Sequence, residues 1–94
     1  MTDLPGGDLV AAGLRDLEQG TETVAALLVA IGAPRLRRLG FAVPRTAADP
    51  ERRLYALLAR DDPDAAHGRY NALVRRLVSF ERAAESLGGG DAGA

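Results

Sequence analysis

The side chains best suited to chemistry lie in one short polar stretch, AHGRYN, at residues 66–71. It contains the chain's single histidine, His67, and its single asparagine, Asn71. A histidine can act as a general base when an acid orients it, and Asp64 lies three residues before His67. Zinc usually takes four ligands, so one histidine without cysteine forms a site only if carboxylates or a second chain complete it. We therefore predict no metal site, no cofactor and no thiol chemistry.

Arg60 extends this pattern toward RNA chemistry. Six residues separate Arg60 from His67, a spacing that resembles the arginine–histidine motif of the HEPN (higher eukaryotes and prokaryotes nucleotide-binding) ribonuclease domains. This resemblance implies an RNA-cleaving or RNA-binding domain that uses Arg60 and His67. Asp62-Pro63, however, predicts a helix boundary between the two residues. Our preferred interpretation is a partly exposed His67 in a first helical turn, with Tyr70 packed beneath it and no catalytic residue.

The size of the chain limits what can position such a site. Ninety-four residues suffice for one small domain with a thin hydrophobic core. The longest apolar run, at residues 24–31, has eight residues and cannot span a bilayer. The first ten residues carry acidic rather than basic side chains and lead into no apolar signal segment. We therefore expect a cytoplasmic protein without a membrane partner.

The charges are unevenly distributed, although the net charge is only −1. All twelve basic residues are arginines. Residues 1–34 carry five acids and one arginine, for −4; residues 35–60 carry seven arginines and two acids, for +5; residues 61–94 carry six acids and four arginines, for −2. A basic middle between acidic ends can neutralise itself on folding or form one side of a complementary interface.

Hydrophobic spacing predicts an all-α protein, a small bundle of four to five helices. Asp8 suits the N-cap of a first helix that Gly20 ends, and Thr21 or Thr23 restarts the chain, unless residues 8–31 form one bent helix. Gly32 to Pro34 predicts a turn into a short helix that Gly40 closes. Asp49 and Pro50 are typical of a helix start and predict a helix over 49–60.

The clearest element is a long C-terminal helix at about residues 63–87, which we expect to begin at Asp62-Pro63. Its apolar residues recur at alternating spacings of four and three, which predicts one continuous buried seam. The members of this seam are Ala66, Tyr70, Leu73, Leu77, Phe80, Ala84 and Leu87. The expected organisation is a flexible leader at 1–7, a single helical domain at 8–87 and a disordered glycine-rich tail at 88–94.

One side of this helix is the candidate partner-binding surface: Arg69 and Arg76 flank one edge of the seam, Arg75 and Arg82 lie further round, and Val78 points almost opposite the seam. Arginines together with a valine resemble the composition of protein interfaces, although a solvated mixed-charge surface has the same appearance. We predict that this side docks an acidic protein surface. The residues involved are Arg69, Asn71, Arg75, Arg76, Val78 and Arg82.

Nucleic acid is a less favoured partner. Four arginines lie within residues 35–45, and a helix-turn-helix around Gly32–Pro34 would make the chain a small DNA-binding regulator. Nucleic-acid-binding domains usually carry stronger net positive charge or several stacking rings, and here Phe41 is the one aromatic residue near these arginines.

Two stretches, ALLVAIGAPRLRRLGFAVP at 26–44 and AHGRYNALVRRLVSFERA at 66–83, are similar to small bacterial helical proteins. Some of these resemble antitoxins encoded beside nucleotidyltransferase-like toxins. The resemblance implies a protein that binds and blocks a toxin enzyme without catalysis of its own. We therefore predict a non-enzymatic, antitoxin-like interaction protein. A HEPN-like domain and a DNA-binding regulator are the alternatives, and a homodimer also stays open.

Overall fold

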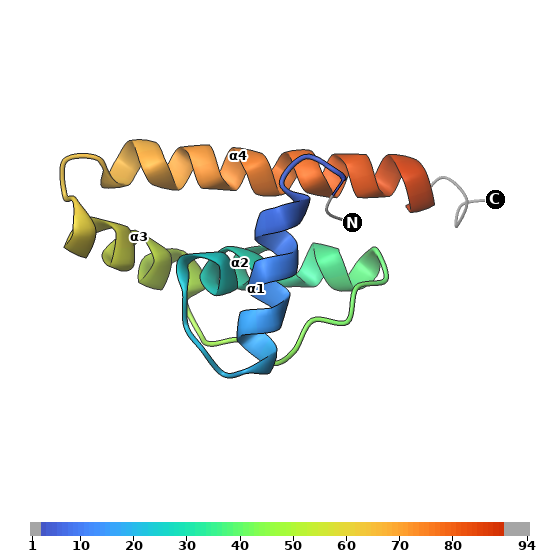
Figure 1. Cartoon of the computed structure of the whole chain (residues 1–94), viewed down its shortest axis with the longest axis horizontal. Coiled ribbons are helices and arrows are strands. Elements are labelled where there is room, and N and C mark those ends of the chain that lie inside the picture. Colours follow the sequence, from blue (N-terminus) through green and yellow to red (C-terminus); the bar gives the residue numbers. More distant parts are fainter. Residues whose placement is uncertain (1–2, 90–94) are drawn as a thin grey trace.

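The computed structural model describes residues 3–89, which form four α-helices and one π-helical turn (Figure 1). The helices are α1 (Gly7–Glu18), α2 (Val24–Arg38), α3 (Pro50–Asp61) and α4 (Ala66–Ala84), and the π turn η1 (Glu85–Gly89) follows α4. No strand occurs in this range, so the predicted all-α class is confirmed. None of the described helices is long and apolar enough to cross a membrane.

Helix α2 is the central element of the bundle. It contacts α1, α3 and α4, whereas α3 packs against α2 and the beginning of α4. Figure 1 shows α4 along one long side of the molecule, with α2 and α3 beneath it and α1 crossing α2. The result is an elongated molecule with principal extents of 45 × 25 × 21 Å.

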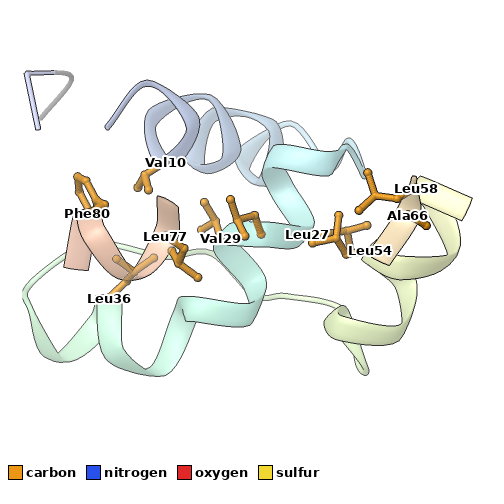
Figure 2. Close-up of a cluster of buried hydrophobic side chains, with 10 residues drawn as sticks. Val10, Leu27, Val29, Leu36, Leu54, Leu58, Ala66, Leu77 and Phe80 are labelled. Carbon is orange, nitrogen blue, oxygen red and sulfur yellow. The ribbon is translucent and has the colours of Figure 1, made fainter. Parts of the chain in front are cut away.

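The hydrophobic core runs along this length in two connected groups (Figure 2). Leu36, Leu77 and Phe80 lie at one end, while Leu54, Leu58 and Ala66 lie at the other. Between them, side chains of α2 such as Val29 fill the middle. The predicted seam of α4 faces this core, since its members from Ala66 to Ala84 are buried or half-buried. Leu87 was wrongly included, because 66% of it is exposed.

The break between the first two helices is real. Gly20 has a positive φ of 71°, and the amide of Thr21 donates to the carbonyl of Asp16 at 2.8 Å, which closes α1 in the manner of a Schellman motif. Thr23 is the N-cap of α2, and its Oγ1 accepts a hydrogen bond from the amide of Ala26 at 3.1 Å. The chain therefore forms two helices here rather than one bent helix.

Two helix starts differ in detail from the prediction. Helix α1 begins at Gly7 with Gly6 as its N-cap, so Asp8 lies in the first turn instead of capping it. Leu4, inside the segment expected to be a flexible leader, packs against the core. Pro50 does open α3, but Asp49 before it adopts a φ of 53° and makes no capping hydrogen bond with its side chain.

The turn predicted at Gly32–Pro34 was wrong, because α2 continues through all three residues to Arg38. Gly32 and Ala33 are buried, and a Cβ on Gly32 would lie 2.9 Å from Oε2 of Glu81 on α4. Burial of Leu36 in the following turn favours helix despite the amide that Pro34 lacks. No separate short helix and no helix-turn-helix forms here. Gly40, with a φ of 100°, is a helix stop as predicted, but the helix that it ends is α2 and not a separate short one.

The long C-terminal helix also starts later than predicted. Asp62 is extended, and its Oδ1 accepts hydrogen bonds from the amides of Asp64 and Ala65 at 3.1 and 3.3 Å. Asp62-Pro63 therefore forms a side-chain-stabilised turn, and α4 begins at Ala66 rather than near residue 63. The α-helix ends at Ala84, and the π turn η1 takes the place of its predicted last turn. Residues 90–94 of the predicted tail lie outside the described residues.

We expect replacement of Leu77 by alanine to lower the free energy of unfolding by about 2–5 kcal/mol, because it leaves a cavity in the core. Leu77 is 3% exposed and lies at the α2–α4 contact. Leu87→Ala on the same segment is the control and should cost less than about 0.5 kcal/mol. Chemical denaturation measures both values, and equal losses would contradict the assignment of the buried face.

Candidate interaction surface on helix α4

All six residues predicted to bind a partner lie on α4, but the structure divides them into two sets. Arg69 and Arg76 lie on the flank of the helix that faces α3 and α1. The other four residues recur at spacings of four, three and four, which places them on one line along a helix. We call this line the outer stripe; it consists of Asn71, Arg75, Val78 and Arg82. Val78 is half-buried, and the other three are exposed.

The flanking arginines form ion pairs within the protein. Nη1 of Arg69 lies 2.8 Å from Oδ2 of Asp61 at the end of α3. Nη2 of Arg76 lies 3.4 Å from Oδ1 of Asp8 in the first turn of α1. All four side chains are largely exposed, so each pair contributes about 1 kcal/mol or less. Their role is to tie α4 to its neighbours, which leaves them less available to a partner.

The arginines of the outer stripe have no such partners. No ion pair or hydrogen bond between residues 3 and 89 involves the side chain of Arg75 or Arg82. Arg82 lies seven positions after Arg75, which is about 10 Å along the helix axis. They therefore present two guanidinium groups to solvent on one line, with Val78 between them. Each group offers several donors in a plane that matches a carboxylate.

The His67 region lacks the geometry of an acid–base site. Nε2 of His67 lies 3.2 Å from Nδ2 of Asn71, one turn further along α4. In the described part of the chain no carboxylate hydrogen-bonds to His67, and Arg60 on α3 makes no hydrogen bond with it. The Asp62–Ala65 turn lies between the two residues, as the Asp-Pro boundary predicted. Within this range, no group of three or more potential ligand side chains gathers to hold a metal ion.

Glu81 is the residue that sequence reasoning missed. It is 5% exposed and lies against Gly32 of α2, with its Oε1 3.9 Å from Nη1 of Arg35. Burial raises the pKa of this carboxyl, while Arg35 and Arg38 oppose the shift. Its position in the sequence does indicate burial, because Glu81 lies four residues after Leu77 and directly after Phe80, and both of these belong to the buried seam. Because Gly32 has no side chain, α2 lies close to α4, and α4 therefore buries Glu81 in addition to its apolar seam.

Comparison with known proteins gives no relative. No family model, curated protein or solved structure matches this chain significantly. The antitoxin resemblance of residues 26–44 and 66–83 therefore has no support beyond those two stretches.

We expect the purified protein to show no ribonuclease activity, because His67 has neither an orienting acid nor a contact with Arg60. Incubation with single-stranded and structured RNA, followed by gel electrophoresis, measures cleavage. His67→Ala and Arg60→Ala provide the comparison. Cleavage by the wild type that both substitutions abolish would instead establish a HEPN-like site.

We expect Glu81→Gln to stabilise the protein at neutral pH and to have a smaller effect in acid. The pKa of Glu81 is higher in the folded protein than in the unfolded chain, so the folded protein holds this proton more tightly. The resulting contribution to the free energy of unfolding is fully present below the unfolded pKa and is lost as the pH rises through the folded pKa. Glutamine has no proton to lose, so its advantage over the wild type should grow across that window.

Urea denaturation at several values between about pH 4 and about pH 8 measures this difference in the free energy of unfolding. Glu85→Gln is the matched control, since Glu85 also pairs with Arg35 but is largely exposed to solvent. A pH-independent difference for Glu81→Gln would show that its charge is not destabilised by burial.

Proposed function

We propose that this protein is a non-enzymatic interaction module that docks an acidic protein surface through the outer stripe of α4. The observation that supports this most directly is the contrast among four arginines of one helix. Arg69 and Arg76 pair with acids of the same chain, whereas Arg75 and Arg82 have no acidic partner within residues 3–89. A stripe that is not used for folding is available for binding.

The chemistry of the stripe fits a protein partner. Guanidinium groups bind carboxylates through two parallel hydrogen bonds, which strengthen when an interface excludes water. Val78, half-buried between the two arginines, provides an apolar centre, and Asn71 contributes both a donor and an acceptor. A complementary surface would carry two carboxylates about 10 Å apart, on either side of a small apolar contact.

The resemblance found in the sequence suggests which partner to test first. It implies a nucleotidyltransferase-like toxin, whose inhibition would require the module to cover or deform an active site. The protein encoded by a neighbouring gene is therefore the first candidate for co-expression. The chemistry argued for the stripe requires an acidic surface and does not depend on this particular identity.

The absence of cysteine allows the stripe to be tested directly. Ser79 is exposed at the border of the stripe, so Ser79→Cys accepts a photo-crosslinking group beside Arg75 and Arg82. Gln19→Cys, exposed at the end of α1, provides the same label away from α4. Crosslinking in cells of the source organism, followed by mass spectrometry, should identify a partner from the Ser79 label that the Gln19 label does not capture.

Charge reversal then tests the mechanism with the partner so identified. Arg75→Glu with Arg82→Glu should weaken its binding at least about tenfold, or about 1.4 kcal/mol, and leave helicity unchanged. The matched control is Arg15→Glu with Arg60→Glu, which makes the same charge change at exposed positions of α1 and α3. Equal losses for both pairs would mean long-range charge effects only. Undiminished binding would place the contact elsewhere, and capture of nucleic acid instead of protein would overturn the proposal.

A further inference from the structure

A cavity of about 160 Å³ lies at the opposite side of α2 from the α4 contact, beneath the turn that joins α1 to α2. Its walls are mostly apolar and include Leu17 of α1 and Leu27 of α2. Ala26 and Ala30, one helical turn apart on α2, form part of the floor. The cavity exists because methyl side chains occupy these two positions, where longer ones would fill the space.

The segment between α2 and α3 forms the other wall. Nη2 of Arg37 donates to the carbonyls of Val43 and Pro44 at 3.2 and 2.9 Å, which holds the first half of this segment against the end of α2. Beyond Pro44, Arg45 and Ala47 line the cavity. The cavity is thus bounded by three separate parts of the chain.

The charges at the rim favour an anion. Glu22 lines the cavity, but its Oε1 lies 3.3 Å from Nε of Arg53, so that carboxylate already has a basic partner within the protein. Arg45 lines the cavity and forms no ion pair with any acid of the described chain. Thr21 also lines the cavity, and a threonine hydroxyl is a neutral donor. The rim therefore carries one uncompensated positive charge above an apolar floor.

We infer that this cavity binds a small aliphatic monocarboxylate, with its hydrocarbon part on Ala26 and Ala30 and its carboxylate on Arg45. Size supports the hydrocarbon part, because a cavity of about 150 Å³ in another protein accommodates benzene, a six-carbon molecule. Charge supports the single carboxylate, since one guanidinium pairs with one carboxylate. A phosphate ester would bring a second negative charge that no described group at the rim compensates.

A six-carbon branched acid, 4-methylpentanoate, is the probe, and 4-methylpentanamide is its neutral counterpart of the same shape. Both are titrated into the 94-residue protein, and methyl NMR of labelled alanine and leucine reports on Ala26, Leu27 and Ala30. The acid should produce saturable shifts at these methyl groups, with a Kd on the order of 1–10 mM, which is usual for so few atoms. The amide should bind about fivefold more weakly or worse.

Two substitutions test the charge of Arg45 and the apolar space of the cavity separately. Arg45→Gln, at an exposed position, should weaken the acid about fivefold and remove the preference for acid over amide. Ala30→Leu should abolish binding of both probes by filling the floor. Arg52→Gln removes an exposed arginine from α3 that does not line the cavity, and it should change the Kd by less than about twofold.

Each contrary result has a definite meaning. Absence of saturable shifts at Ala26 and Ala30 in the wild type would overturn the site. Equal binding of acid and amide, or an unchanged Kd in Arg45→Gln, would overturn the assignment of a carboxylate ligand. Because no residue of α4 lines the cavity, neither result depends on the proposed interaction of the outer stripe.

Discussion

The close approach of α1 to α2 is the contact on which the rest of the bundle depends. Gly13, in the middle of α1, lies so near α2 that a Cβ atom there would overlap the carbonyl of Ala25 and the side chain of Val29. Glycine inside a helix costs about 1 kcal/mol relative to alanine, and tight packing offsets this cost. Gly32 allows a similar approach between α2 and α4. Helix α2 thereby lies at the centre of the bundle, with its buried faces against all three other helices.

Folding also uses much of the uneven charge seen along the sequence. Arg53 of the basic middle pairs with Glu22 of the acidic first segment, and Arg35 pairs with Glu81 and Glu85 of the last. The partly self-neutralising arrangement was one of two possibilities that the sequence left open. Some arginines pair with no acid in the described chain. These are the basic groups that a ligand or partner can contact.

The local parts of this fold were predictable and the tertiary parts were not. Helical spacing and glycine stops depend on neighbouring residues, so the seam of α4 from Ala66 to Ala84 and the helix stops at Gly20 and Gly40 were predicted correctly. Pro34 was misjudged because burial of Leu36, a tertiary effect, outweighs its local preference. The same limit applies to the site. A helical projection groups Asn71, Arg75, Val78 and Arg82, but the acids that engage Arg69 and Arg76 come from other helices.

Helix α4 combines two tasks, since its inner seam closes the core and its outer stripe is the proposed docking surface. A partner that recognises the stripe in helical form binds the folded chain and not the unfolded one, so mass action adds its binding energy to the stability of the whole domain. Proteases act on unfolded or opened chains, and a thin core opens readily. The lifetime of the protein in a cell would then follow the supply of its partner: unbound copies would be degraded first, and bound copies would persist.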